Sequence, residues 1–219
     1  MENNKVLKAL KPINIILSLI SIAMGLVSIL VLVLFNFADV VTIYTDSAKY
    51  ADGFSYPGYQ TIFYGFGNMI IQGYTENGFN IWMFLGFFLP LVGCIVACVM
   101  LSTNLLRRGT NKKRAILEGI VGALLIFGAI IIFNVDKLWI ANAQKVTDSY
   151  TNYYEVYLLP AINGEVYFGK DSFPDFVFVI CLIAGIIKLL NCCMLLFQKY
   201  YARSVNKQKV QINEKGDNA

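Results

Sequence analysis

The chain has 219 residues, of which 57% are hydrophobic and 15% are charged, and its formal net charge is +4. This balance excludes an ordinary soluble domain and is typical of membrane proteins. The sequence contains no histidine, which removes the commonest metal ligand and the commonest general base. The five cysteines all lie in apolar segments, so no disulfide framework is predicted.

The first long apolar segment is residues 13–35, which follow a polar lead at residues 1–12. About 20 helical residues cross a bilayer core of about 30 Å, so this segment predicts a first transmembrane helix. A cleaved signal peptide is the alternative, but its apolar region would be about 7–15 residues long and would end in a small-residue cleavage site. Small residues also recur on one face of this helix, where a neighbouring helix can approach closely: Ser18, Ser21, Gly25 and Ser28.

Residues 36–80 form a long loop that is rich in Tyr and Phe. Disordered segments are poor in aromatic residues, so we expect this loop to be folded or docked on the membrane surface. A turn at Pro57-Gly58 and a short strand near residues 60–64 are predicted within it. Its aromatic side chains either pack at the bilayer interface or bind a partner. The binding candidates are Tyr56, Tyr59, Phe63, Tyr64 and Phe66.

Residues 81–103 predict the second transmembrane helix, with Pro90 near its middle. Proline removes the hydrogen bond to the carbonyl of Gly86 and predicts a kink there. Residues 104–114 form a short basic turn, and residues 115–135 predict the third helix.

The second long loop covers residues 136–175. It contains two apolar-aromatic runs, at residues 156–159 and 166–168, which predict a β-hairpin. Residues 176–197 predict the fourth transmembrane helix. The remaining residues, 198–219, form a polar tail that we expect to fray at its end.

The distribution of basic residues predicts the orientation. Thirteen of the 18 Lys and Arg residues lie in the N-terminal lead, the short turn and the tail, and four lie in the two long loops. The positive-inside rule therefore places both termini in the cytoplasm and the long loops outside. The basic inner face is expected to attract anionic lipid headgroups, which explains the net charge without nucleic acid.

Lys188 is a charge inside the fourth apolar segment, and Asn191 lies one turn after it. Such a charge usually faces the bundle interior, a partner or water. Lys188 lies about nine residues, or roughly 14 Å, from the expected inner end of its helix. It can snorkel part of this distance or pair with Glu118 of the third helix, with Asn191 bridging them. The alternative is a substrate, ion or proton site.

These elements predict an all-α membrane protein, a four-helix transmembrane bundle with two long outer loops that contain some β structure. Its topology resembles that of claudins and tetraspanins, and strands in both outer loops are closer to the claudin plan. The first loop lacks the Trp, Gly-Leu-Trp and cysteine pair of claudins, and the second lacks the Cys-Cys-Gly of tetraspanins. The resemblance therefore assigns a role to no residue of this chain.

Two functions remain open at this point. The first is a non-enzymatic protein of a bacterial cell membrane that binds a membrane-protein partner or a second copy through its outer loops. The second is a small transporter or an oligomeric channel subunit that uses Lys188, Asn191 and Glu118. No set of nucleophile, base and acid appears, so we expect no enzyme activity, no cofactor and no metal.

Overall fold

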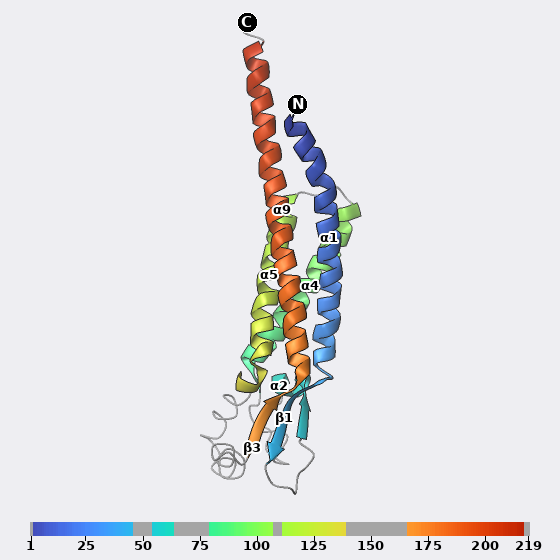
Figure 1. The fold of residues 1–219 in the computed structure, drawn as a ribbon, viewed down its shortest axis with the longest axis vertical. Coiled ribbons are helices and arrows are strands. Elements are labelled where there is room, and N and C mark those ends of the chain that lie inside the picture. Colours follow the sequence, from blue (N-terminus) through green and yellow to red (C-terminus); the bar gives the residue numbers. More distant parts are fainter. Residues whose placement is uncertain (1, 46–53, 64–78, 107–110, 139–165, 217–219) are drawn as a thin grey trace.

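The computed structural model describes residues 2–45, 54–63, 79–106, 111–138 and 166–216, and these are mostly helical (Figure 1). Four of the helices are long and apolar enough to cross a membrane. They are α1 (Glu2–Phe35), α4 (Ile81–Leu106), α5 (Asn111–Phe133) and α9 (Ser172–Gly216). The prediction of a multi-pass membrane protein with four spanning helices is therefore confirmed. Figure 1 shows both termini at the same end of the bundle, opposite a small sheet.

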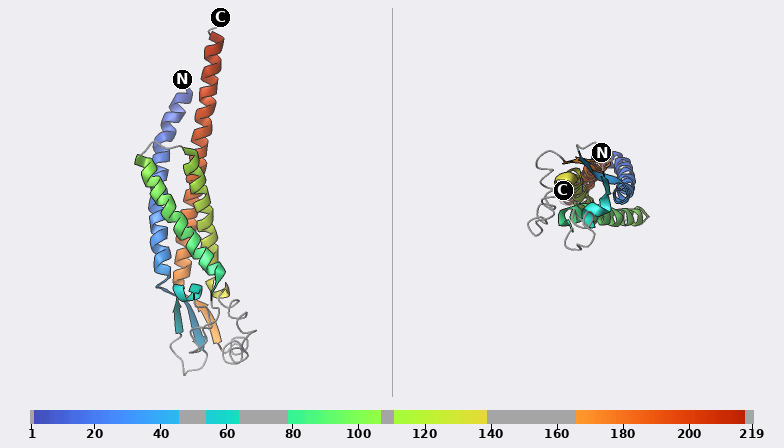
Figure 2. Two further views of the ribbon diagram at one scale, coloured as in Figure 1. Left: turned by 180° about the vertical axis from the view of Figure 1, so that it is seen from behind. Right: turned by 90° about the horizontal axis from the view of Figure 1, so that it is seen from below.

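The four helices form a closed ring of neighbours. Helix α1 packs on α4 and α9, and α5 packs on the same two helices from the other side. Helix α4 crosses the bundle diagonally, from α1 at the end that carries the termini to α5 at the sheet end (Figure 2). Large apolar side chains on the outside of the ring are exposed to the surroundings, as expected where helices face lipid.

Helix α9 continues well beyond the apolar segment. It has 45 residues, which corresponds to a length of about 70 Å. No Pro or Gly occurs between Lys188 and Lys215, so nothing in this stretch interrupts helical hydrogen bonding. The tail that was expected to fray is therefore helical as far as Gly216. In Figure 1 it projects past the other helices.

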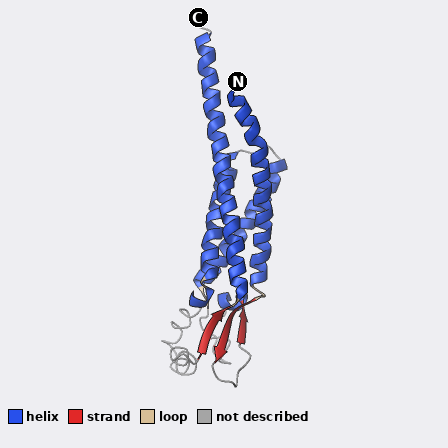
Figure 3. Cartoon of the chain, in the orientation of Figure 1, coloured by secondary structure: helices blue, strands red, loops and turns tan. Residues whose placement is uncertain are grey.

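A three-stranded antiparallel sheet lies at the other end of the bundle, in red in Figure 3. Strand β1 (Asp39–Thr45) is central, between β2 (Phe54–Pro57) and β3 (Val166–Lys170). The register pairs Thr42 with Ser55 on β2 and with Gly169 on β3. The sheet therefore joins the two long loops to each other.

The strand predicted near residues 60–64 is wrong, because Gly58–Phe63 form the short helix α2. The backbone N–H of Gly58 donates to the carbonyl of Ala38 at 3.1 Å, and the Thr61 hydroxyl donates to the carbonyl of Gly58 at 2.7 Å. A Cβ atom at residue 58 would lie 2.1 Å from the Phe35 carbonyl oxygen, so only glycine fits at this close approach. These contacts end strand β2 and turn the chain into a helix.

The predicted hairpin of the second loop stays a prediction. Val166–Phe168 lie in β3, and their described partner strand is β1. The run at residues 156–159 lies outside the described part of the chain.

The sheet and α2 are attached to the bundle at several points. The N–H of Asn80 donates to the Ile62 carbonyl of α2 at 3.0 Å. Asn80 also caps α4 by accepting a hydrogen bond from the N–H of Met83 at 3.2 Å, and its amide donates to the carbonyl of Leu138 at 3.2 Å. Lys170, at the end of β3, forms an ion pair with Asp175 and donates to the Phe133 carbonyl at 3.1 Å. We call β1, β2, α2 and β3 together the cap. These bonds fix the cap relative to the helices.

Candidate functional site

Polar side chains line one half of the bundle interior. The buried face of α1 repeats every three or four residues, and its members in the half nearer the termini are small or polar: Asn14, Ser18, Ser21 and Gly25. Towards the sheet the same face becomes apolar, with Val31, Leu32 and Phe35. The change occurs near the level at which Lys188 reaches α1.

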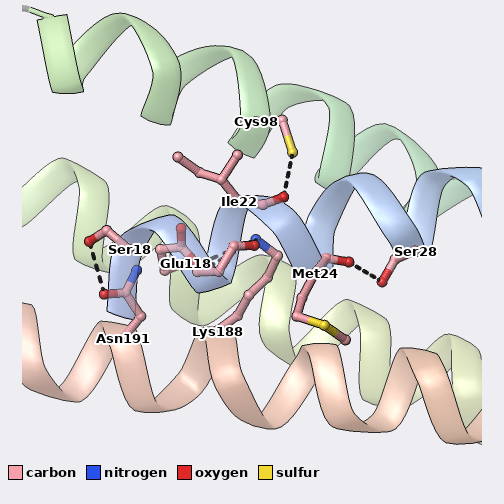
Figure 4. Close-up of polar contacts among 9 residues, drawn as sticks. Ser18, Ile22, Met24, Ser28, Cys98, Glu118, Lys188 and Asn191 are labelled. Atoms are coloured by element: carbon pink, nitrogen blue, oxygen red, sulfur yellow. Dashed lines mark hydrogen bonds and ion pairs between the residues drawn. The ribbon is translucent and has the colours of Figure 1, made fainter. Parts of the chain in front are cut away.

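Lys188 and Glu118 form a buried ion pair inside the bundle (Figure 4). Both side chains are 0% exposed, and Lys188 Nζ lies 3.5 Å from Glu118 Oε2. Ser21 joins them, because its hydroxyl donates to Glu118 Oε2 at 2.7 Å and Lys188 Nζ donates to its carbonyl oxygen at 3.3 Å. The three residues connect α9, α5 and α1, so a single cluster ties three of the four helices together.

Two further contacts continue this cluster towards the termini. The Ser18 hydroxyl donates to Asn191 Oδ1 at 3.3 Å, and the Asn14 amide donates to the side-chain oxygen of Gln198. We call Asn14, Ser18, Ser21, Glu118, Lys188 and Asn191 the polar column. The predicted candidates Lys188 and Glu118 thus form an ion pair, while Asn191, one turn further along α9, bonds to Ser18.

Small residues make room for the ammonium group. A Cβ atom at Gly25 would lie 3.4 Å from Lys188 Nζ and 2.9 Å from the sulfur of Cys98 on α4. Figure 4 shows Cys98 pointing from α4 to the Ile22 carbonyl of α1, at a distance of 3.9 Å. A larger side chain at residue 25 would push α1 away from both α4 and α9.

Several polar atoms of the column have no hydrogen-bond partner within the described structure. They are Glu118 Oε1, Asn191 Nδ2 and Asn14 Oδ1, on side chains that are at most 5% exposed. Nε and one terminal nitrogen of Arg114, one helical turn before Glu118, are also buried without a partner. Buried polar groups of this kind are normally satisfied by protein or by water.

The half of the bundle nearer the sheet is apolar. Its fully buried side chains include Leu125, Ala129 and Ile132 of α5, and Val177, Cys181 and Ala184 of α9. The one buried hydroxyl described there on α1, that of Ser28, donates to the Met24 carbonyl of its own helix at 2.8 Å. The described side chains of this half therefore form a closed apolar core.

Pro90 and Gly86 lie at the crossing of α4 and α5. A Cβ atom at Gly128 of α5 would lie 2.4 Å from the Gly86 carbonyl oxygen and 2.5 Å from Cγ of Pro90. The carbonyl freed by the proline thus faces the backbone of a glycine, which can offer a weak Cα–H contact. The predicted kink itself stays a prediction. The role of Gly128 at this helix crossing was not predicted. The sequence feature that could have indicated it is a glycine within an apolar span.

The aromatic candidates of the first loop are only partly described. Tyr59 lies exposed on α2, Tyr56 lies in β2 opposite Val41, and Phe63 ends α2. Tyr64 and Phe66 lie outside the described residues. A strongly exposed ring that the sequence did not single out is Phe37, between α1 and β1, with 75% of its surface accessible.

The chemistry available to the polar column is charge pairing and hydrogen bonding. Among the described residues, no group of three or more His, Cys, Asp or Glu side chains could hold a metal ion. Ser18 and Ser21 were predicted only as small residues at a close helix contact, yet their hydroxyls are partners of Asn191 and Glu118. The two serines are three residues apart and so share one helical face. This spacing is the sequence feature that could have indicated their hydrogen-bonding role.

The sequence matches neither a protein-family model nor a curated protein.

Proposed function

We propose that the protein is a non-enzymatic membrane protein that binds or scaffolds a partner through its cap. The proposal places it in a bacterial cell membrane, with both termini in the cytoplasm and the cap outside. The observation that carries it is the central position of β1, which pairs with a strand from each outer loop. Two loops far apart in sequence thereby form one surface.

The cap is held close to the bundle. Three residues separate α1 from β1, and one residue, Asp171, separates β3 from α9. The N–H of Asp171 donates to the Val40 carbonyl at 3.1 Å, which joins the ends of both strands at the membrane side. Such a preformed surface loses little conformational entropy on binding.

The interior of the bundle supports the same proposal. The ion pair of Lys188 and Glu118 is buried, and Oε2 of Glu118 has its hydrogen-bond partners. The half of the core nearer the sheet is apolar. Four helices arranged in this way act as a support for the cap. The basic lead, turn and tail add attraction to anionic lipid headgroups on the terminal side.

The proposed partner is another membrane protein or a second copy of this chain. Phe37 and Trp82 are exposed aromatic side chains at the junction of cap and bundle. Aromatic side chains are enriched at the energetic centres of protein interfaces, and a partner anchored in the same membrane would meet the cap at this level.

A photo-reactive amino acid at residue 37, in cells of the native host, tests this proposal. We expect light to produce a discrete protein–protein adduct at this position. The matched control is residue 30, since Leu30 is also exposed on the side of α1 but lies within the apolar span. Only lipid adducts are expected there. Lipid adducts alone at both positions would contradict partner binding at the cap junction.

A further inference from the structure

We propose that the polar column is a narrow vestibule that water enters only from the end of the bundle that carries both termini, and that it ends at the Lys188–Glu118 pair. This goes beyond the role of the cap, because it assigns a ligand, water, and a direction of access to the bundle interior.

The first argument comes from the unpartnered atoms. Glu118 Oε1 and Asn191 Nδ2 are fully buried, one an acceptor and the other a donor, and neither has a partner in the described structure. Leaving such groups unsatisfied is costly, and most costly for a charged group. A ligand that bonds both kinds of atom would remove this cost.

The second argument selects the ligand. An anion would bond to Asn191 Nδ2 but would be repelled by the Glu118 carboxylate. A cation would bond to Glu118 Oε1 but would be repelled by the Lys188 ammonium group. Water donates and accepts, and buried waters typically form about three hydrogen bonds to polar groups of this kind. The mixed charges of the column therefore favour water over either ion.

The third argument gives the direction. From Lys188 the polar side chains continue towards the termini through Asn191 to Gln198, which is half-exposed. Asn14 and Ser18 are buried on the α1 side of this stretch, and Leu195 is a buried apolar residue on its α9 side. On the other side of Lys188 the described core is apolar, beginning with Ala184 and Cys181. Water thus has polar contacts along the terminal half and none along the sheetward half.

A matched pair of serines on α1 makes the proposal testable. Ser18 and Ser28 are both buried on the same helical face, at 1% and 0% exposure, but they lie on opposite sides of the proposed end of the vestibule. Each is replaced by cysteine, as Ser18→Cys or Ser28→Cys, in a full-length chain whose five native cysteines are replaced by alanine. Serine and cysteine are similar in size, so the packing change is small.

The probe is the silver ion, which binds thiols and enters narrow aqueous paths. It is added to one side of sealed vesicles, and the thiols left unblocked are counted with a maleimide after denaturation. We expect S18C to be blocked from the terminal side an order of magnitude faster than from the sheet side. We expect S28C to stay unblocked from both sides.

Three results decide the question. Fast blocking of S18C from the terminal side alone, with S28C protected, supports the vestibule. No blocking of S18C in the folded protein overturns it, since the column would then be dry. Blocking of S28C from the sheet side overturns the closed end and would indicate a continuous path.

If the α1 variants do not fold, Asn191→Cys and Ala184→Cys give the same comparison on α9. The cross-linking result at residue 37 is independent of all these outcomes.

Discussion

At the scale of single residues, the buried ion pair is the strongest constraint on this protein. A charge removed from water is costly unless a counter-charge and hydrogen bonds compensate it. Lys188 has the Glu118 carboxylate, the Ser21 hydroxyl and the Ser21 carbonyl within 3.5 Å. The ammonium group therefore stays inside the bundle because three helices supply its partners.

The first prediction concerns the pair itself. Lys188→Met and Glu118→Gln each leave the other member of the pair without its counter-charge. We expect each to lower the free energy of unfolding by about 3 kcal/mol or more. The double variant should lose clearly less than the sum, because it leaves no unpaired charge. Chemical unfolding in detergent micelles measures all three, with Lys11→Met, on the exposed N-terminal part of α1, as the control. A double variant that loses as much free energy of unfolding as the two single variants together would contradict the pairing.

The second prediction separates two serines of α1. Ser21→Ala removes the 2.7 Å hydrogen bond to Glu118 and should cost about 1–3 kcal/mol of unfolding free energy. Ser28→Ala removes only a bond to a carbonyl of its own helix, at 2.8 Å, and should change stability by about 0.5 kcal/mol or less. Thermal unfolding of both variants provides the comparison, and equal losses would show that the Ser21–Glu118 bond has no special weight.

At the scale of the helices, the crossing of α4 and α5 depends on glycine. Close approach of helices in membranes relies on small residues at the contact, since apolar burial gives no preference over lipid. Gly86 and Gly128 meet there, with Pro90 beside them. The diagonal path of α4 brings its sheetward end onto α5 at this contact (Figure 2).

The third prediction tests this crossing. In Gly128→Ala the new methyl group would lie 2.4 Å from the Gly86 carbonyl oxygen, so the helices must separate. We expect a loss of stability, although alanine favours a helix over glycine by about 1 kcal/mol. Gly93→Ala on α4 is the control, because its nearest neighbour would lie at an ordinary 3.4 Å. The control should be neutral or stabilising, and melting temperatures that rise for both variants would contradict the tight crossing.

At the scale of the whole molecule, the cap and the bundle form a continuous structure. Strands from the two loops meet on β1, and hydrogen bonds from the Asn80 N–H to Ile62 of α2 and from Lys170 of β3 to Phe133 attach the cap to the helices. A load on the cap is thus transmitted to α1, α4, α5 and α9 together. This arrangement suits a protein that holds a partner in a fixed orientation.

The fourth prediction tests the strand order. Thr42→Cys with Gly169→Cys should form a disulfide, because these residues face each other on β1 and β3. Ser55→Cys with Gly169→Cys should not, since β1 lies between their strands and separates them by about 10 Å. Cleavage at a protease site inserted between residues 107 and 110 shows on a non-reducing gel whether the two halves of the chain stay linked. A link in the second pair alone would contradict the order.

The sequence predicts the helices better than the contacts between them. Hydropathy alone locates four spans, because the bilayer demands about 20 apolar residues from each. The pairing of Lys188 with Glu118 was an open alternative, because linear distance from a segment end places Glu118 much nearer the membrane surface. The structure brings the two side chains together, with Lys188 Nζ 3.5 Å from Glu118 Oε2, because this distance depends on how α5 and α9 pack and not on the position of each residue in its own segment. Helix α2 was missed because its start depends on the contact between Gly58 and Phe35.

We propose that the bundle is closed on the side of the cap, so that the protein acts through the cap and does not conduct. The most direct test combines Lys188→Cys with Glu118→Gln in the cysteine-free chain. A small charged thiol reagent is then applied to sealed vesicles from each side. We predict that residue 188 does not react from the sheet side, because the apolar core between α5 and α9 excludes the reagent. A reaction from the sheet side in the folded protein would contradict the account and would make transport the leading function.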